Sequence, residues 1–518
     1  MSVFSGPSIT TSGLILALDA ADNTSLLSRV EVLVVAGGGG GGAYAAGAGG
    51  GAGGLIYNSS FSVSVGTAYT VTVGAGGTGG VWSTPLATNG GNSEFGSLTA
   101  VGGGAAGRGW SDNAGSSGGS GGGGGGSDGV SSPGSQAAGG AGTLGQGFAG
   151  GYGLRVSTNS GSAGGGGGAG GVGANATNAA AGNGGIGLLY DISGIPTYYA
   201  GGGGGGGYNA VSVQGTGGLG GGGNGGNGNS ISLAGTANTG GGGGGNNAAG
   251  GNTSGGNGGS GIVIVRYYGE QRASGGTVTS AEGFTIHTFT SVGSSSFTPN
   301  ATWYDLSGYG NNGTINSGEF STANNGYLQN SGNVTNFFYI SIPDSTSIYA
   351  AFSPVSGGWT IEETVYTYSV NYPEADAGTV VSGQAYSAGN IGFDWNHGVG
   401  NTQFVFGQSN NPVSGYNDQP TISLNAPYSN FNYWKLRSMI WNRSSNTVSL
   451  YINGVYQGVG STPNTAGITI YDGGGISLGT LYGWKHFGRR SLVRVYNRIL
   501  TATEINQNYQ AIKTRYDI

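Results

Sequence analysis

The sequence predicts a mainly β protein that combines a β-sandwich with a glycine-rich region of strands and polyglycine-II helices. The first half is rich in glycine, which makes up 123 of the 518 residues against an ordinary share of about 7%. The second half, from residue 302 onward, consists of short strand patterns separated by turn residues, as in two packed antiparallel sheets. Charged residues make up only 7% of the chain, and a formal net charge of −6 gives no electrostatic footprint for nucleic acid.

The glycine runs can form an ordered bundle or a flexible linker. Six glycines in a row lose much backbone entropy on folding, so they order only within a compensating lattice. Polyglycine helices with three residues per turn provide one, because their free N–H and C=O groups bond sideways to neighbouring helices. Several runs of similar length favour the bundle, since a linker needs only one. The runs lie at 37–42, 121–126, 164–168, 201–207, 220–223 and 240–245.

Strand patterns bracket the glycine runs at both ends. Residues 29–37 are an apolar, valine-rich run, and 261–269 and 284–291 are further strands. In 61–74, apolar and small polar residues alternate, which predicts two strands joined as a hairpin at Gly66-Thr67. The glycine region is therefore expected to begin and end on sheets.

The second half predicts a sandwich closed by one helix. Alternation in 447–458 places one strand face on a core, and Asn453-Gly454 is a favoured two-residue hairpin turn. Thr501 and Glu504 have the spacing of a capping box, with an apolar face following on residues 505–516.

Two families resemble parts of this chain. The glycine region contains VEVLVVAGGGGGG (30–42), YTVTVGAGG (69–77), GNSEFGSLTAVGGG (91–104), PTYYAGGGGGGG (196–207) and GSGIVIVRY (259–267). These strings resemble the glycine-rich domains of bacteriophage tail-fibre and other virion proteins. The resemblance covers about 29–297 and implies a polyglycine sandwich whose distal loops contact a host receptor.

The second resemblance is to the concanavalin A-like, laminin-G-like jelly rolls. Its motifs are WYDLSGYGNNGTI (303–315), NTVSLYINGVYQG (446–458) and SLVRVYNRILTATEINQNY (491–509). In that family the first strand leads closely into the WYDLSG segment, whereas here a glycine block separates 13–28 from 302. The resemblance therefore implies an interrupted jelly roll: residues 1–28 hold its first strand, 29–299 are the inserted glycine-rich domain, and 300–518 are the remainder with the C-terminal helix.

Candidate binding residues are aromatic and polar side chains of presumed loops. Sugar faces stack on aromatic rings, and amides bind hydroxyl groups; the alternative for each aromatic residue is packing in the core. The candidates for glycan or receptor contact are Trp395, Asn396, His397, Trp484, His486, Trp82, Trp110, Tyr198, Tyr199 and Tyr208.

The loop 305–313 offers hard oxygen ligands for Ca²⁺ through Asp305, Ser307 and Asn311. Laminin-G-like domains often carry such an ion, so the resemblance allows Ca²⁺ as the one cofactor. The same residue types also form tight turns by local hydrogen bonding, and this alternative stays open.

Catalytic residues are not predicted. A glycosidase needs two carboxylates straddling the bond; Glu374 and Asp376 lack the third acidic residue of the ExDxxE pattern. Glu362 and Glu363 are adjacent on a strand and point to opposite faces.

The sequence thus favours a phage structural protein, a receptor-binding adhesin of a tail fibre or tail tip that attaches the virion to host-surface glycans. The alternatives are a virion architectural protein, such as a capsid decoration or fibre connector, and a polysaccharide depolymerase. Expected partners are a host glycan or receptor, other virion proteins and a second copy in a homo-oligomer. No signal segment and no apolar run long enough to span a membrane is found, so we expect synthesis in a host cytoplasm, release by lysis and a place in the virion.

Overall fold

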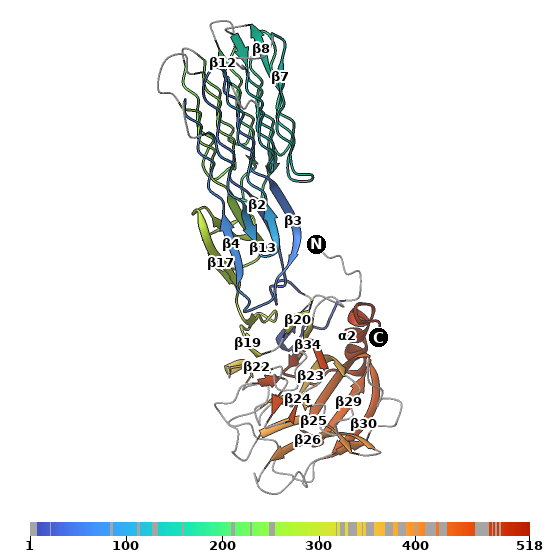
Figure 1. Cartoon of the computed structure of the whole chain (residues 1–518). Coiled ribbons are helices and arrows are strands. Elements are labelled where there is room, and N and C mark those ends of the chain that lie inside the picture. Colours follow the sequence, from blue (N-terminus) through green and yellow to red (C-terminus); the bar gives the residue numbers. More distant parts are fainter. Residues whose placement is uncertain are drawn as a thin grey trace. The chain divides into compact units, whose positions relative to one another are not determined.

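A computed structural model of the chain places its strands in two compact units (Figure 1). One unit comprises residues 1–28, 62–66 and 299–518, and the other comprises 29–61 and 67–298. We call them the sandwich unit and the glycine unit. The structure describes residues 8–518 except 21, 83–85, 111–113, 127–132, 158–159, 209–212, 228–229, 248–253, 318, 322–326, 330–338, 344, 349–356, 368–376, 382–389, 399–400, 410–420, 424–432, 462–475, 479, 482–483 and 486–487.

The sandwich unit contains two antiparallel sheets of eight strands each. The first runs in the order β20 (Glu319–Ser321), β21 (Tyr327–Gln329), β34 (Gly488–Tyr496), β23 (Gly358–Thr367), β28 (Trp434–Asn442), β29 (Thr447–Ile452) and β30 (Val455–Ser461), with β1 (Leu14–Asp19) also on β34. The second runs in the order β18 (Thr302–Trp303), β19 (Gly313–Ser317), β22 (Tyr339–Ile342), β31 (Ile476–Leu478), β24 (Ala377–Val381), β25 (Asn390–Gly398), β26 (Asn401–Ser409) and β27 (Thr421–Ser423). A short pair, β32 (Thr480–Leu481) and β33 (Trp484–Lys485), stands beside them.

The core of this unit lies between the sheets. Trp303 and Ile340 from the second sheet share one buried cluster with Ile361, Met439 and Val493 from the first. Strand β1 pairs with β34 from Leu14↔Tyr496 to Asp19↔Leu492, so the ends of the chain meet in one sheet. The mainly β fold class and the interrupted sandwich are confirmed.

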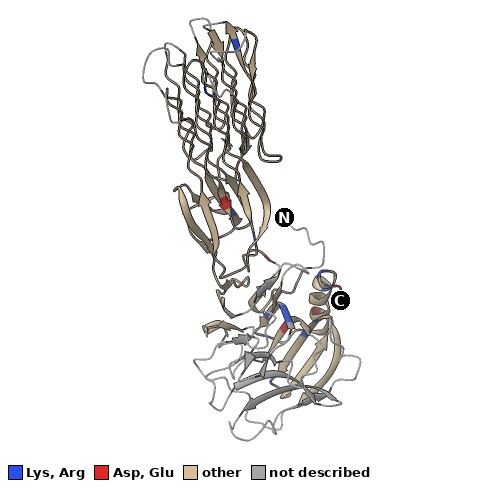
Figure 2. Cartoon of the chain, viewed as in Figure 1, with Lys and Arg blue, Asp and Glu red and all other residues tan. Residues whose placement is uncertain are grey.

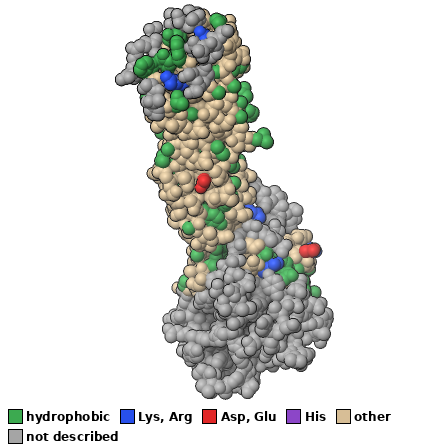
Figure 3. Space-filling model, in the orientation of Figure 1, with side chains coloured by type: hydrophobic (Ala, Val, Ile, Leu, Met, Phe, Trp, Pro, Cys, Tyr) green, Lys and Arg blue, Asp and Glu red, His purple; other side chains and the backbone are tan. Residues whose placement is uncertain are grey.

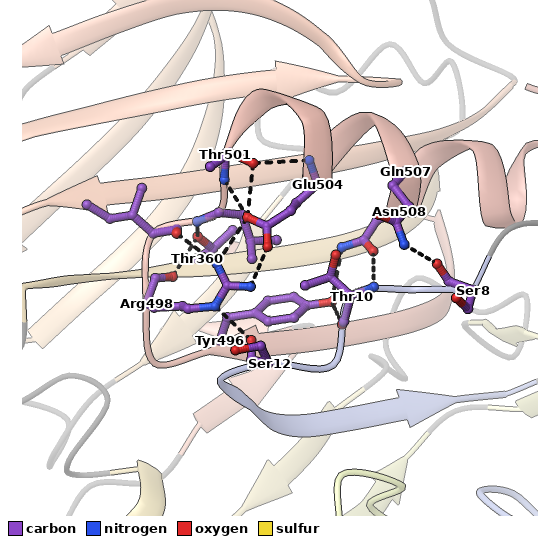
Figure 4. A network of polar contacts seen from close by, with 12 residues as sticks. Ser8, Thr10, Ser12, Thr360, Tyr496, Arg498, Thr501, Glu504, Gln507 and Asn508 are labelled. Atoms are coloured by element: carbon purple, nitrogen blue, oxygen red, sulfur yellow. Dashed lines mark hydrogen bonds and ion pairs between the residues drawn. The ribbon is translucent and has the colours of Figure 1, made fainter.

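Helix α2 (Ala502–Tyr516) closes the sandwich unit, and its cap is built as the sequence predicts. The Thr501 hydroxyl accepts the Glu504 N–H, and the Glu504 carboxylate accepts the Thr501 N–H at 2.9 Å. Asn508 reaches from the helix to the N-terminal segment, where its Oδ1 accepts the Thr10 N–H at 2.8 Å (Figure 4). Arg498 donates to both carboxylate oxygens of Glu504. The helix therefore fastens both chain ends to the sheet.

The glycine unit has two five-stranded sheets at one end. They run in the orders β15 (Thr277–Ala281), β16 (Phe284–Phe289), β13 (Ile262–Tyr268), β2 (Arg29–Val35), β3 (Leu55–Ser62) and β14 (Ala273–Ser274), β17 (Gly293–Pro299), β4 (Tyr69–Val73), β5 (Ser93–Phe95), β6 (Leu98–Ala100). A four-stranded sheet, β12 (Gly207–Tyr208), β9 (Ser160–Ser162), β8 (Gly153–Ser157) and β7 (Gln136–Ala137), lies at the other end of this unit (Figure 1). A separate pair joins β10 (Leu188–Tyr190) to β11 (Thr197–Tyr199).

The hairpin predicted at Gly66-Thr67 is wrong. Strand β3 pairs with β2, whereas β4 pairs with β17 and β5, so the two strands belong to different sheets. Residues 62–66 between them belong to the sandwich unit, where Val65 packs on the core. The apolar residues of 61–74 do alternate, but they pack into two different cores instead of one face of a hairpin.

Between these sheets the glycine tracts form helices with three residues per turn. A Cβ atom built on Gly37 would lie 2.0 Å from the Ala75 carbonyl oxygen, and one on Gly40 would lie 2.0 Å from that of Thr78, three residues further in both tracts. The same three-residue spacing is found on two other neighbouring tracts. Cβ atoms on Gly38 and Gly41 would meet the carbonyl oxygens of Gly241 and Gly244, and those on Gly39 and Gly42 would meet the carbonyl oxygens of Gly104 and Gly107. A period of three with lateral bonding is the polyglycine-II arrangement.

The tract 37–42 is surrounded by six others. Its N–H groups donate to carbonyls of the tracts 88–91, 256–259 and 48–51, and its carbonyls accept from 103–106, 77–80 and 243–246, at N···O distances of 2.8–3.0 Å. Every backbone donor and acceptor of the tract is thereby paired, as buried backbone requires. The predicted bundle of glycine helices is confirmed and is a hexagonal lattice around this tract.

Asparagine side chains complete the lattice where a neighbouring tract is missing. The Asn257 Oδ1 accepts the Gly79 N–H at 2.8 Å, while the Gly258 N–H donates to the Gly77 carbonyl at 2.8 Å. Asn89 and Asn224 are each also followed by glycine and make the same pair of bonds to other tracts, one through the side-chain oxygen and one through the N–H of the following glycine. We call this pair of bonds an asparagine clip. The side-chain amide thus supplies the carbonyl that another helix would have provided.

Charge is nearly absent from the lattice. The few charged side chains that the structure describes in the glycine unit lie near its two ends (Figure 2). Side-chain charge therefore contributes nothing to lattice cohesion, which depends on the backbone bonds. None of the helices in the described part of the chain has the length and hydrophobicity that a membrane span requires.

Candidate functional site

The candidate site lies at the end of the lattice remote from the five-stranded sheets, where the tract that follows β2 turns back. The turn is closed by the Gly42 N–H, which donates to the Ala48 carbonyl at 2.8 Å, and by the Gly47 N–H, which donates to the Asn246 carbonyl at 2.9 Å. Three consecutive residues in it have positive φ: Tyr44 (68°), Ala45 (36°) and Ala46 (71°).

Such a backbone is unfavourable for residues other than glycine. Left-handed conformations are rare for bulky side chains, and each costs of order 1–3 kcal/mol. Trp110, in another turn, also has positive φ, 81°. Residues held in strained conformations cluster at functional sites, so these two turns are marked as candidates independently of their side chains.

The aromatic rings of the two strained turns meet the ring of Trp82, which comes from a third segment. The Tyr44 ring centroid lies 5.9 Å from that of Trp82 and 5.8 Å from that of Trp110, both edge to face. The Arg108 guanidinium lies 5.4 Å from the Tyr44 ring centroid and donates to the Trp82 carbonyl at 2.9 Å. We call Tyr44, Trp82, Trp110 and Arg108 the aromatic cluster.

Both tryptophans remain open to solvent, with 52% of Trp82 and 41% of Trp110 exposed. Their edge-to-face contacts with Tyr44 fix the ring orientations, while the outer surfaces are free to meet a partner. Fixed, exposed tryptophan faces beside an arginine are typical of binding hot spots. The cluster has the chemistry of a binding surface and contains no carboxylate or imidazole for catalysis.

The other predicted tyrosines lie in different surroundings. Tyr208, in β12, packs half-buried against alanines that include Ala46, so it supports the turn of Tyr44. Tyr198 in β11 is partly exposed and pairs with Leu189. Tyr199 is only 3% exposed within the core cluster of Leu33 and Val35, so packing accounts for it and no surface remains for a receptor.

The sandwich candidates lie on strands, not in the expected loops. Trp395, Asn396 and His397 belong to β25, which pairs with β26 along its whole length. Trp484 belongs to β33, opposite Leu481. His486 lies outside the described residues, and of β24–β27 and β31–β33 the structure describes only the backbone.

The predicted calcium ligands are engaged in hydrogen bonds within the protein. The Asp305 Oδ1 accepts the N–H groups of Ala17 and Ser307, and its Oδ2 accepts the Ser307 hydroxyl and the Asn311 N–H. The Asn311 Oδ1 accepts hydroxyl hydrogen bonds from Ser345 and Ser347. Each Asp305 carboxylate oxygen accepts two hydrogen bonds, so these residues fit a turn that ties β1 of the first sheet to the β18–β19 connection of the second sheet better than they fit Ca²⁺. Among the described residues there is no group of three or more His, Cys, Asp or Glu side chains arranged to hold a metal ion.

The adjacent carboxylates of β23 point to opposite faces, as predicted. Glu362 contacts Arg494, Ser438 and Asn508 on the helix side, while Glu363 pairs with Arg437 and Arg490 on the other. Both are buried, and burial raises the pKa of Glu362 against the opposing effect of Arg494. Their partners give them structural roles. Glu374 and Asp376 lie outside the described residues.

Sequence reasoning missed Tyr44 and Arg108. Tyr44 is the single aromatic residue in a stretch of glycine and alanine at 37–54. A lone aromatic residue between two glycine tracts indicates a turn that exposes its side chain. Arg108 stands two residues before Trp110, and it is one of very few charges in the lattice region. Both signals were available in the sequence.

The fold and the cluster define a two-unit β protein with exposed aromatic side chains on a polyglycine lattice. The sequence profile of the glycine-rich domain family matches residues 20–268, a little under half of the chain. No curated protein sequence matches it.

Several solved structures are similar to part of the chain. The binding domain of Paraclostridial Mosquitocidal Protein 1 is 19% identical with a TM-score of 0.31, covering 40% of this chain and 48% of that one. A Trypanosoma rangeli sialidase in complex with the inhibitor DANA is 13% identical with a TM-score of 0.30, covering 40% and 31%. Domain 4 of the arabinanase AbnA from Geobacillus stearothermophilus, in complex with arabinotriose, is 18% identical with a TM-score of 0.27, covering 40% and 91%. The chain spans less than half the length of the first two, and at these TM-scores the likenesses say nothing about function.

Proposed function

We propose that the chain is a non-enzymatic, receptor-binding adhesin of a phage tail fibre or tail tip, and that the aromatic cluster contacts a glycan of the host surface. The observation that carries the proposal is the pair of exposed tryptophans packed edge to face on Tyr44, with Tyr44 and Trp110 on strained turns. Such strain persists only where the surrounding structure enforces it, and here the lattice supplies that structure.

The lattice suits the role of a rigid support. A binding surface on a pre-organised scaffold loses little conformational entropy when it meets its partner. The turn of Tyr44 is anchored on both sides by lattice bonds of Gly42 and Gly47. The resemblance of the glycine strings to virion proteins favours a place in the virion.

A glycan is the receptor class that the cluster supports best. Tryptophan faces offer flat apolar surfaces on which sugar rings stack, and the guanidinium of Arg108 offers donors for hydroxyl oxygens. A contribution of the sandwich unit to glycan binding through Trp395, Asn396, His397 and Trp484 stays a prediction, as does calcium binding at Asp305.

The test is adsorption of the protein to host cells together with binding to a glycan array. We expect Trp82→Ala to weaken binding at least tenfold, which corresponds to about 1.4 kcal/mol. Tyr268→Ala is the matched control, because Tyr268 is an exposed aromatic of the same unit (57%) that belongs neither to the cluster nor to the predicted contact residues. Equal binding by both variants and the wild type would remove the cluster from the proposal.

The second candidate function is architectural. An exposed aromatic cluster can also anchor the chain to another virion subunit. Quenching of tryptophan fluorescence on intact particles separates the two: a receptor surface stays accessible to the quencher, whereas a subunit contact is protected. Release of reducing sugar from host polysaccharide would instead indicate the third candidate, a depolymerase.

A further inference from the structure

A second group of aromatic and charged side chains lies on the five-stranded sheet that contains β2, β3 and β13, at the end of the glycine unit remote from the aromatic cluster. Glu31 of β2 and Arg266 of β13 stand directly opposite each other in the sheet register. Arg266 donates to the Glu31 Oε2 at 2.8 Å, and the Tyr57 hydroxyl of β3 donates to the same oxygen at 2.8 Å. Three adjacent strands thus carry one connected polar group.

The loop that follows β10 adds a second carboxylate and a second ring. The Asp191 backbone carbonyl accepts a hydrogen bond from Arg266 at 3.2 Å, and Ile192 is buried in the core cluster of this sheet, so the loop is fixed on the sheet. The ring centroids of Tyr57 and Tyr190 lie 4.9 Å apart, with the ring planes tilted by 37°. We call this set the flank site: Glu31, Tyr57, Tyr190, Asp191 and Arg266.

The flank site is open to solvent although its parts are fixed. The Asp191 side chain is 71% exposed, and Tyr57 is 37% exposed. The Arg266 guanidinium carbon lies 4.5 Å from the ring centroid of Phe284, a contact that adds to the hydrogen bonds that hold the arginine. Burial and the hydrogen bond to Glu31 raise the pKa of Tyr57 to about 12, so its hydroxyl stays protonated. A ligand would therefore meet groups whose positions are already set, which limits the entropy lost on binding.

Two carboxylate oxygens of the flank site have no hydrogen-bond donor in the part of the chain that the structure describes. The contact of Asp191 with Arg266, at 3.4 Å, uses Oδ1, and both hydrogen bonds to Glu31 use Oε2, which leaves Asp191 Oδ2 and Glu31 Oε1. The Tyr57 hydroxyl has donated its hydrogen, so its oxygen can still accept one. A ligand at this site must therefore bring hydrogen-bond donors.

Charged side chains are sparse on the glycine unit, including the face seen in Figure 3. Asp191 is the single charged residue between Arg155 and Arg266 in the sequence. The lattice does not need this charge, because backbone bonds hold the tracts together. An exposed carboxylate, fixed next to a pair of tyrosine rings, is explained better by a ligand than by the fold.

We infer that the flank site binds a neutral sugar unit of a host glycan, separately from the aromatic cluster. Sugar hydroxyls supply the donors that the carboxylate oxygens lack, and the CH groups of a sugar ring pack on a tyrosine ring. An acidic sugar would place a third carboxylate beside Glu31 and Asp191, which like charges disfavour. The inference takes from the proposed function only that the chain binds glycans. Two contacts on one unit bind a surface of repeated sugars with greater avidity than either contact alone.

The test is an array of defined neutral and acidic oligosaccharides, probed with the full-length chain, with Trp82→Ala, with Asp191→Ala and with the double variant. We expect Trp82→Ala to keep its binding to a set of neutral oligosaccharides, and the added Asp191→Ala to weaken that binding at least tenfold. Glu270→Ala is the matched control, because it also removes one exposed carboxylate of the glycine unit but lies outside the flank site. In the Trp82→Ala background it should leave binding unchanged. Since the Asp191 side chain is exposed, the Asp191 and Glu270 variants should unfold alike in calorimetry.

The inference is overturned if Asp191→Ala and Glu270→Ala bind every oligosaccharide equally, if Trp82→Ala binds none, or if the sugars lost with Asp191 are acidic. Failure of the aromatic cluster gives a different pattern, in which Trp82→Ala binds as the wild type does while Asp191→Ala loses neutral sugars. A wild-type chain that binds no glycan overturns both proposals.

Discussion

Substitution of Gly39 by alanine tests whether the lattice depends on close backbone approach. Gly39 does not have the positive φ that alanine avoids, so its backbone alone would accept a side chain. Space is what excludes one: a Cβ would lie 2.1 Å from the Gly104 carbonyl oxygen and 2.6 Å from its carbon. The tract 103–106 would have to move away by about 1 Å to restore an ordinary contact.

The cost follows from the bonds that such a shift stretches. Between these two tracts the Gly103 N–H donates to the Gly37 carbonyl at 2.9 Å, and the Ala106 N–H donates to the Gly40 carbonyl at 3.0 Å. Two buried hydrogen bonds at about 1 kcal/mol each, plus about 1–3 kcal/mol for overpacking, give a destabilisation of about 3–5 kcal/mol.

The assay is calorimetric unfolding of the full chain, with amide exchange of residues 37–54 to assign the change to the glycine unit. Gly171→Ala is the matched control: its Cβ would meet only the Ile186 side chain at 3.4 Å and the Ile186 nitrogen at 3.9 Å, and its φ is not positive. This control should change stability by no more than about 0.5–1 kcal/mol. If Gly39→Ala were as stable as Gly171→Ala, glycine would not be required for packing and the lattice argument would be refuted.

Three further outcomes are expected. Asn257→Ala leaves the buried Gly79 N–H without its 2.8 Å acceptor and should destabilise the glycine unit by about 1 kcal/mol in calorimetry, with Asn257→Asp restoring most of it. His287 is buried and hydrogen-bonded to the Tyr267 hydroxyl, and burial lowers its pKa from the ordinary 6.5. Because the folded protein favours the neutral imidazole, its contribution to the free energy of unfolding should be fully present above pH 6.5 and be lost as the pH falls below that value. In an unfolding series from pH 8 to about 4, His287→Gln should make the free energy of unfolding depend less on pH. The pKa of Glu504 is lowered to about 2, chiefly by Arg498 and then by the Thr501 backbone N–H. The stabilisation of the helix cap by its carboxylate should therefore be present above about pH 4.5 and be lost as the pH falls toward 2. Faster amide exchange at the start of the C-terminal helix at low pH would report this loss.

The strand and tract pattern could be predicted because it follows from local chemistry. Valine-rich runs beside glycine tracts predicted sheets at the ends of a lattice, and the Thr501-Glu504 spacing predicted the helix cap. Which tract lies beside which could not be predicted, because glycine tracts are chemically alike and their pairing is decided by turns and clips such as that of Asn257.

The errors have a common physical origin in tertiary context. The alternation of apolar residues in 61–73 fits a hairpin, yet Val65 packs on the sandwich core, while β3 and β4 belong to two different sheets. Trp395, flanked by glycine-containing sequence, resembled a loop residue, but its backbone pairs in β25. The aromatic cluster was predicted only in part: Trp82 and Trp110 were named from the sequence, whereas Tyr44 and Arg108 were missed although the sequence marks both.

The six-neighbour arrangement around residues 37–42 has a consequence for how this protein can diversify. An ordinary hydrophobic core transmits a change in one side chain to those packed against it. The tract 37–42 has no side chains, and its register is held by main-chain atoms that are identical for every sequence. Turns that join the tracts can therefore gain, lose or exchange residues with little to readjust beneath them, which lets new surface chemistries arise on an unchanged support.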